Sequence, residues 1–184
     1  MSLVNVEQSQ LVIIDVQDKL GAAMPSKVIN RVINNTTLLL RVAGLLNVPV
    51  VVTEQYPAGL GATIADVAAT IPATAVRLEK TSFSATGCEP FNAQVRTNTR
   101  SQVIIAGMEA HVCVLQTAVR LREAGYEPLV VEDAICSRKL ENYQNALERI
   151  RQNSITIVST ESIVFEWLAD KNNPQFRAVS GLLR

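Results

Sequence analysis

Six short apolar runs, rich in Val and Ile, recur along the 184-residue chain and alternate with longer stretches of helical periodicity. Two of them, QLVIIDV at 10–16 and QVIIAG at 102–107, are largely continuous rather than alternating between apolar and polar residues. Continuous runs are typical of strands that are covered on both faces, as in a parallel sheet. The predicted strands are Gln10–Val16, Val48–Thr53, Ala75–Glu79, Gln102–Gly107, Pro128–Glu132 and Ile155–Ser159.

Apolar residues three and four positions apart predict helices between these strands. The longest predicted helix runs up to an Asn-Val-Pro sequence, and another ends at Gly125, a residue type that is favoured just beyond helix ends. The Gly- and Ala-rich stretch Tyr56–Pro72 is interpreted as a loop with a short helix. The predicted helices are Ser26–Leu46, His111–Ala124, Glu141–Gln152, Glu161–Ala169 and Pro174–Leu183.

This alternation of strand and helix favours a single α/β domain over residues 1–184. Because strand–helix–strand connections in a parallel sheet are right-handed, we expect a Rossmann-like, three-layer α/β/α sandwich. It would be doubly wound around a mainly parallel six-stranded sheet. Ligands bind to such folds at the carboxyl ends of the strands, where the strand order reverses. Functional residues are therefore expected just after the apolar runs.

The composition restricts the kinds of partner. Hydrophobic residues make up 48% of the chain and charged residues 18%, which argues against general disorder. The 17 basic and 17 acidic side chains are scattered and cancel, so no nucleic-acid or membrane partner is expected. The most apolar stretch, Leu38–Val52, is interrupted by Arg41 and Asn47 and is too short to span a bilayer. We expect a small-molecule substrate, and the apolar balance favours a homo-oligomer (dimer, tetramer or larger).

The N-terminal sequence and the cysteines bear on the compartment. The stretch MSLVNVEQSQLVIID has no basic region and no clear cleavage site, so no signal peptide is expected. Cys88, Cys113 and Cys136 are an odd number without CxxC spacing, which argues against a disulfide framework. A reducing, cytoplasmic location is the expectation. Cys88, in a predicted loop, and Cys136, after the fifth strand, are interpreted as structural.

Several classes of site lack the residues they need. His111 is the only histidine, and the three cysteines are dispersed, so a zinc-type site of imidazole and thiolate ligands is not expected. The sequence has no GxGxxG, GxxxxGK[ST] or GxSxG motif, so dinucleotide-binding, P-loop and serine-hydrolase functions lose support. We therefore expect no metal and no cofactor.

Asp15 and Lys80 each come at the end of a predicted strand. The acidic residue in LVIIDVQ is either a cap for the following helix or a functional acid, and the residues alone leave both open. The lysine in VRLEKTSFS would ordinarily be a solvated surface charge. Its four-carbon stem would also allow its ammonium to reach Asp15.

Cys113, in QVIIAGMEAHVCVLQTAV, is expected close to the N-terminus of the helix that follows the fourth strand. Peptide dipoles and free N–H groups favour a thiolate at such a place and can bind a developing oxyanion. The alternative is a small apolar core residue, the commoner role of a free cysteine. His111 is two residues away and should point away from Cys113 on a helix, so Asp15 is the better-placed proton acceptor.

Three segments together resemble the isochorismatase-like cysteine hydrolase superfamily, which includes nicotinamidases, N-carbamoylsarcosine amidohydrolases and isochorismatases. They are LVIIDVQ, EKTSFSA and GMEAHVCVLQTA, and the resemblance runs from about Val12 to the last helix. TEQYPAGLGAT and VEDAICSR also resemble a subgroup of isochorismatase domain-containing proteins. The order and spacing of the three segments make the resemblance fairly specific.

The resemblance implies a catalytic triad of Asp15, Lys80 and Cys113 and a homo-oligomeric assembly. It also implies a non-proline cis peptide at Met108–Glu109, with the backbone N–H groups of Glu109 and Cys113 forming the oxyanion hole. The expected pocket residues, which would bind substrate, are Gln17, Tyr56 and Phe83.

One segment departs from the nicotinamidase pattern. Nicotinamidases carry Asp-x-His-Pro after the second strand to bind a metal, whereas this chain has Glu54-Gln55-Tyr56-Pro57. This difference argues against a metal and against nicotinamide as substrate. A cysteine in the triad favours hydrolysis of a C–N bond in an amide, ureido or carbamoyl compound through an acyl-enzyme. The alternatives are isochorismatase-type ether hydrolysis, with Asp15 as acid, and a non-catalytic scaffolding member.

Overall fold

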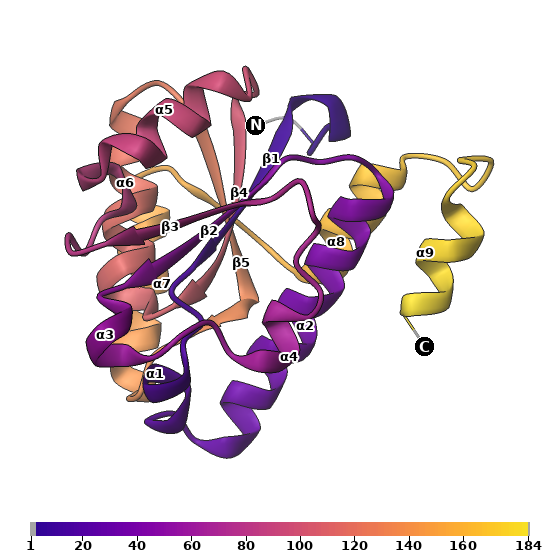
Figure 1. Ribbon diagram of the computed structural model, residues 1–184. Coiled ribbons are helices and arrows are strands. Elements are labelled where there is room, and N and C mark those ends of the chain that lie inside the picture. The colour runs from indigo at the N-terminus through magenta and orange to yellow at the C-terminus, as the bar shows by residue number, and fades with distance from the viewer. Residues whose placement is uncertain (1–2, 184) are drawn as a thin grey trace.

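The computed structural model describes residues 3–183 (Figure 1). The strands are β1 (Ser9–Ile14), β2 (Val50–Gln55), β3 (Val76–Lys80), β4 (Gln102–Met108), β5 (Glu127–Cys136) and β6 (Thr156–Val158). The α-helices are α1 (Asp18–Ala22), α2 (Ser26–Leu45), α3 (Pro57–Leu60), α4 (Ala65–Ala68), α5 (Glu89–Thr97), α6 (Leu115–Glu123), α7 (Leu140–Gln152), α8 (Thr160–Leu168) and α9 (Phe176–Leu182). Short 3₁₀ turns, η1 (Val6–Gln8) and η2 (Ala85–Gly87), and a π-helical turn, η3 (Ala110–Val114), complete the set.

The strands form one six-stranded sheet in the order β3-β2-β1-β4-β5-β6, and every neighbouring pair is parallel. The predicted doubly wound α/β fold is confirmed. The strand order reverses between β1 and β4, which pair along their length as far as Ile14 and Gly107. Segments that follow β1 and β4 therefore meet at the switch point, where ligands bind in folds of this kind.

Helices cover both faces of the sheet (Figure 1). On one face lie α2 and α8, with α9 outside them, and their buried side chains include Leu39 and Trp167. On the other face lie α5, α6 and α7, which bury Phe91, Leu121 and Ile150. Each fully buried side chain of this size contributes about 1.5–3 kcal/mol of transfer free energy. The two apolar layers hold the carboxyl ends of the central strands in fixed positions.

The burial of the strands explains the apolar runs in the sequence. Every residue of β1 and β4 is buried, because helices cover both of their faces and neighbouring strands cover both of their edges. The edge strand β3 is different, since its residues are partly or fully exposed up to Lys80, which is buried. A buried lysine at the end of an otherwise exposed strand is unusual and indicates a specific partner.

Two helices lie where none was predicted, α1 and α5. Helix α5 buries only Phe91 and Val95, one turn apart, and its other side chains are largely polar, so its apolar periodicity is weak. The helix predicted to begin at His111 instead opens with the π-helical turn η3 and becomes α-helical only at Leu115. The predicted strand boundaries elsewhere lie within a few residues of those observed, apart from the end of β5.

The fifth strand continues four residues beyond its predicted end at Glu132, to Cys136. Its pairing with β4 is interrupted between Ile105 and Gly107, and β5 contributes extra residues before the pairing resumes. Such an irregularity redirects the end of a strand, and bulges are frequent beside active sites. The polar residues of the insertion, Glu132 and Asp133, hide the continuation of the strand from a sequence pattern.

No helix within residues 3–183 combines the length and the apolar character that a bilayer crossing requires. The cytoplasmic location stays a prediction.

Candidate active site

Asp15 lies directly after β1, at the switch point, and is completely buried. Its φ of 51° is in the left-handed region, which few non-glycine residues adopt. Its N–H donates to the carbonyl of Thr53, and its own carbonyl accepts from the N–H of Gln17. Strained residues of this kind cluster at functional sites, because the surrounding structure must hold them in place.

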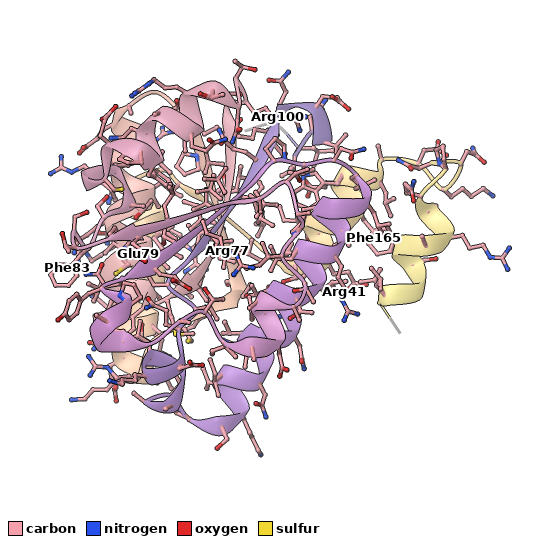
Figure 2. The ribbon with its side chains drawn as sticks, viewed as in Figure 1. Arg41, Arg77, Glu79, Phe83, Arg100 and Phe165 are labelled. Carbon is pink, nitrogen blue, oxygen red and sulfur yellow. The ribbon has the colours of Figure 1, made fainter. Side chains whose placement is uncertain are left out.

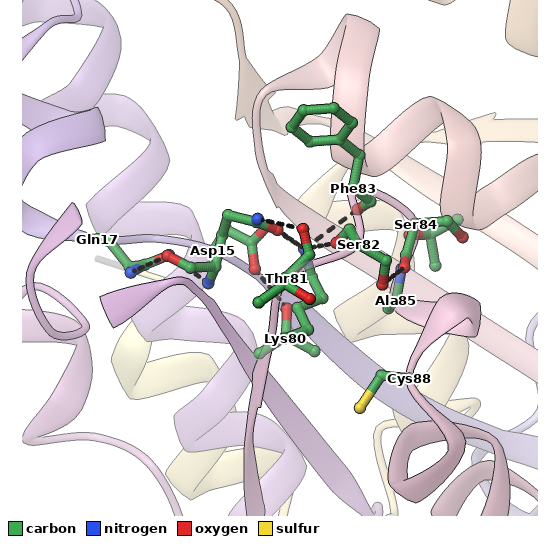
Figure 3. Close-up of polar contacts among 12 residues, drawn as sticks. Asp15, Gln17, Lys80, Thr81, Ser82, Phe83, Ser84, Ala85 and Cys88 are labelled. Carbon is green, nitrogen blue, oxygen red and sulfur yellow. Dashed lines mark hydrogen bonds and ion pairs between the residues drawn. The ribbon is translucent and has the colours of Figure 1, made fainter. Parts of the chain in front are cut away.

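Lys80 ends β3, two strands away from β1, and its side chain reaches Asp15 across the end of β2 (Figure 3). Its Nζ lies 2.7 Å from Asp15 Oδ2, and neither side chain is exposed. The ammonium also donates to Gln55 Oε1 at 2.8 Å and to the carbonyls of Ser82 and Phe83 at 3.1 Å. Lys80 is therefore a buried cation surrounded by acceptors rather than a solvated surface charge.

Thr53 and Gln55, at the end of β2, complete this cluster and were not singled out from the sequence. Thr53 Oγ1 donates to Asp15 Oδ1 at 2.7 Å, so each carboxylate oxygen of Asp15 has its own partner. Gln55 bridges the neighbouring segments, since its Oε1 accepts from Lys80 and its Nε2 donates to the carbonyl of Thr81. The register of Ile14 with Thr53 places the threonine hydroxyl beside the residue that follows β1.

Cys113 lies in η3 and is only 5% exposed, and its thiol lies near enough to Asp15 and Lys80 for both charges to shift its pKa. The three residues of the predicted triad therefore meet at one place. The expectation of a thiolate at rest is wrong: burial, followed by the charge of Asp15, raises the pKa of Cys113 to about 12, while Lys80 opposes this rise. The physical reason is that the thiol is enclosed beside a carboxylate rather than exposed at an open helix end. The resting form is the neutral thiol.

His111 points away from Cys113, as predicted. Its Nδ1 lies 2.9 Å from Ser137 Oγ and its Nε2 lies 3.3 Å from Asn142 Nδ2. The imidazole is thus engaged with the segment that follows β5 and with α7. It is not placed to take a proton from the Cys113 thiol, which leaves the Asp15 carboxylate as the adjacent base.

Glu109 follows β4, and the peptide bond that joins it to Met108 is cis. Its side chain is 7% exposed and pairs with the guanidinium of Arg138. Its carbonyl accepts from the N–H groups of Val112 and Val114 in η3. The same short segment therefore links the end of β4 to the turn that carries Cys113.

The three predicted pocket residues are placed differently from one another. Gln17 is fully buried and its amide is bonded to the backbones of Gln55 and Gly61. Tyr56 and Phe83 are more than half exposed, and Figure 2 places Phe83 at the outer edge of the molecule. In Figure 3 the Phe83 ring points away from the Asp15–Lys80 pair.

A cleft of about 390 Å³ opens beside this cluster. It lies between the end of β3, the start of α3 and the start of α5. Its lining residues are Tyr56, Pro57, Ala58, Glu79, Lys80, Thr81, Ser82, Gly87 and Cys88. Of the three predicted pocket residues, Tyr56 alone lines it.

In the segment that departs from the nicotinamidase pattern, the Glu54 carboxylate forms hydrogen bonds within the protein. Glu54 Oε1 accepts from the N–H and the hydroxyl of Thr63, at 2.7 and 2.6 Å. Among residues 3–183, no group of three or more His, Cys, Asp or Glu side chains is arranged to hold a metal ion. All three cysteines are free, with Cys136 buried and Cys88 half-buried beside the carbonyl of Glu79.

Comparison with known proteins identifies the family. The model of the isochorismatase domain matches residues 9–162. The secreted isochorismatase effector Isc1 of Phytophthora sojae (strain P6497) is 41% identical over 157 residues, which cover 83% of this chain and 74% of that protein. Isochorismatase domain-containing protein 2 of Bos taurus is 33% identical over 176 residues, covering 96% and 83%. The solved structure of MAR1 ribonuclease from Caenorhabditis elegans has a TM-score of 0.92 at 31% identity, covering 99% of this chain and 92% of that one. Together with the doubly wound sheet, these matches place the chain in the isochorismatase family of hydrolases.

Proposed function

We propose that this protein is a cysteine hydrolase that cleaves a C–N bond in a small amide, ureido or carbamoyl compound. Cys113 would be the nucleophile of an acyl-enzyme, with Asp15 and Lys80 completing the triad. The observation that carries the proposal is the placement of the Asp15 carboxylate near the buried Cys113 thiol, whose pKa its charge raises. That carboxylate is itself paired with Lys80 at 2.7 Å. A nucleophile close to a base that a third group orients is the arrangement that covalent catalysis uses.

The first half of the reaction forms the acyl-enzyme. The thiol proton moves to Asp15 as sulfur forms a bond to the carbonyl carbon, and the carbonyl electron pair moves onto oxygen. The N–H groups of Glu109 and Cys113 hold this oxyanion, at about 3–4 kcal/mol per donor. The C–N bond then breaks, and Asp15 returns its proton to the leaving nitrogen. Because the pKa of Cys113 is raised to about 12, proton transfer accompanies attack rather than preceding it.

The second half restores the free enzyme. Asp15 takes a proton from water as the water oxygen attacks the acyl carbon. The C–S bond breaks, the acid product leaves, and sulfur regains the proton from Asp15. Lys80 keeps the carboxylate oriented, since its ammonium donates to Asp15, Gln55 and two backbone carbonyls.

The cleft supports a small substrate. Its volume of about 390 Å³ lies at the lower end of the range of about 300–1,000 Å³ that is typical of ligand sites. We assign Tyr56, which lines the cleft and is more than half exposed, to the rim where a substrate would enter. Gln17 would act indirectly, by fixing the end of β2 through the backbone of Gln55.

The test is a panel of small amides, ureido acids and carbamoyl compounds, scored by ammonia release and by the intact mass of the acid-quenched protein. We expect an acyl adduct on Cys113 with at least one compound. Cys113→Ala should abolish both signals, whereas Cys136→Ala, at a second buried thiol, should retain them. Full turnover in the Cys113→Ala variant would refute the nucleophile.

Isochorismatase-type ether hydrolysis is the second candidate, and the family match and the name of the Phytophthora sojae relative favour it. It would use Asp15 as an acid and leave no adduct. Turnover of isochorismate in the Cys113→Ala variant would support it over the amide mechanism. Absence of any turnover in the unaltered protein, together with an inert Cys113 thiol, would instead indicate a scaffolding role.

We also infer that the chain self-associates. Leu3, Leu140 and Phe165 are large apolar side chains with exposed fractions of 77%, 64% and 44%. Leu3 and Phe165 line the same surface hollow, and contiguous apolar surface is typical of interfaces between copies. Light scattering coupled to gel filtration measures the mass, and a monomer at micromolar concentration would contradict the inference.

A further inference from the structure

The carboxylate of Glu109 is fixed by Arg138 through three contacts. Arg138 Nε lies 3.1 Å from Oε1 and 3.2 Å from Oε2, and the backbone N–H of Arg138 donates to Oε2 at 3.0 Å. The Glu109 side chain is almost completely buried, whereas the Arg138 side chain is 58% exposed. The arginine therefore reaches in from the surface to hold a buried carboxylate.

The backbone of Glu109 is fixed as well. Its carbonyl accepts from the N–H of Val112 at 3.0 Å and from that of Val114 at 3.3 Å. Side chain and carbonyl are thus both held. The N–H of Glu109, which is the proposed oxyanion donor, belongs to a residue that has little freedom to turn.

The irregular pairing of β4 with β5 brings Arg138 to this place. Ile105 is opposite Val130, but Gly107 is opposite Ile135, so β5 advances five residues while β4 advances two. As a result Cys136 lies opposite Met108. Arg138, two residues after Cys136, is then in contact with Glu109. Regular pairing would place other residues beside Glu109.

We propose that Arg138 is a positioning residue, which holds Glu109 so that its N–H points at the developing oxyanion. This inference rests on the proposed cysteine-hydrolase function. An oxyanion donor is useful only when it lies about 2.7–3.1 Å from the charged oxygen of the transition state. Arg138 Nε lies within 3.2 Å of both carboxylate oxygens, and a planar guanidinium holds such a contact in a more fixed direction than a flexible ammonium does, so arginine suits this task better than lysine.

The experiment compares two reactions of the Cys113 thiol, only one of which forms an oxyanion. In the first, sulfur attacks the ester carbon of p-nitrophenyl acetate, the C–O bond breaks, p-nitrophenolate leaves with the electron pair, and Asp15 takes the thiol proton. In the second, sulfur displaces iodide from iodoacetamide, Asp15 again takes the thiol proton, and no charge develops on an oxygen of the reagent. The burst in p-nitrophenolate absorbance gives the rate of acetylation, and the intact mass of the protein over time gives the rate of alkylation.

Arg138→Ala should slow acetylation of Cys113 by about tenfold to a hundredfold, since a small misplacement of a catalytic group costs up to about a hundredfold. Alkylation by iodoacetamide should stay within about twofold of the unaltered protein. Arg138→Lys should recover part of the acetylation rate and serves as the test if Arg138→Ala does not fold. The matched control is Arg96→Ala, at an arginine of similar exposure that pairs with Glu89 on α5, and it should change neither rate.

A double-mutant cycle with Glu109→Gln shows whether the two side chains act through each other. If they do, Glu109→Gln should slow acetylation too, and the double variant should lose no more rate than the more affected single variant. Equal slowing of both reactions in Arg138→Ala, or no slowing of acetylation, would overturn the positioning role while leaving the nucleophile intact. Absence of any acetyl-Cys113 in the unaltered protein would overturn the proposed function, and the role of Arg138 with it.

Discussion

Lys80 Nζ lies 2.7 Å from Asp15 Oδ2, although the two residues are 65 positions apart in the sequence and the strand β2 lies between β1 and β3 in the sheet. Both side chains are completely buried. Removing two charges from water is costly, and their attraction offsets that cost only when further hydrogen bonds satisfy both groups. Thr53, Gln55 and two backbone carbonyls supply those bonds. Both charges of the pair therefore have the further hydrogen bonds that a buried ion pair needs.

Lys80→Met should destabilise the protein by about 3–5 kcal/mol, because it leaves the Asp15 carboxylate buried without its cation. The unfolding free energy from urea titration at pH 7 measures this loss. The double variant Asp15→Asn with Lys80→Met removes both charges and should recover a substantial part of the loss. Equal stability of the single and double variants would contradict the coupling of the two charges.

Thr53→Val should lower the unfolding free energy by about 1.5–3 kcal/mol, the usual contribution of a hydrogen bond to a charged group. It should also slow acylation of Cys113, because Asp15 Oδ1 loses the hydroxyl that orients it. Thr36→Val is the matched control. Thr36 Oγ1 is buried and, within the described residues, has no hydrogen-bond partner, so the substitution should be neutral or stabilising in urea unfolding. A similar loss in both variants would contradict a specific role for the Thr53 hydroxyl.

The sequence was sufficient to predict the fold because the central strands are buried on both faces. β1 and β4 read as continuous apolar runs for that reason, and the strand–helix alternation then leaves few topologies. The helix α5 and the extension of β5 to Cys136 escaped prediction. The first has only two buried apolar residues, and the second depends on an insertion of polar residues that only the pairing with β4 explains.

The candidate site could be predicted only in part, because its residues come from strand ends far apart in the sequence. Asp15, Lys80 and Cys113 were found through a resemblance to known motifs, since a lysine at a strand end is ordinarily solvated. Thr53 carries no such signal. Its contact with Asp15 depends on the register of β1 with β2, which a single sequence does not specify. The state of the Cys113 thiol was mispredicted because its burial depends on packing that the position in the helix does not reveal.

Gly107→Ala should lower the unfolding free energy by at least about 3 kcal/mol, from left-handed strain together with a steric clash. The φ of Gly107 is +123°, and an added Cβ would lie 2.0 Å from the carbonyl oxygen of Ile14. Gly125→Ala separates the strain from the clash, since the φ of Gly125 is +89° but no atom lies within 4 Å of an added Cβ. This substitution should lower the unfolding free energy by only about 1–2 kcal/mol. Gly181→Ala, in α9 and with open space around it, should be neutral or stabilising by up to about 1 kcal/mol. Equal losses at Gly107 and Gly125 in urea unfolding would contradict the close approach of β1 and β4.

The protein should lose stability as the pH rises above about 9, because two buried thiols resist ionisation. Burial raises the pKa values of Cys113 and Cys136 from 9.0 to about 12. Between these values the unfolded chain releases thiol protons that the folded protein retains, so a higher pH favours unfolding. Below about pH 8 the thiols are almost fully protonated in both states and contribute almost no pH dependence. Each thiol should therefore cost about 1.4 kcal/mol at pH 10, and the loss should grow until the pH approaches 12.

Urea unfolding at pH 7, 8, 9 and 10 tests this expectation, with Cys136→Ala as the comparison. The variant lacks one of the two thiols, so its stability should fall less steeply than that of the unaltered protein above pH 9, by about 1.4 kcal/mol at pH 10. The difference between the two proteins should be constant from pH 7 to 8, which provides the internal control for the cavity that the substitution creates. Parallel curves up to pH 10 would mean that the Cys136 thiol ionises as easily in the folded protein as in the unfolded chain.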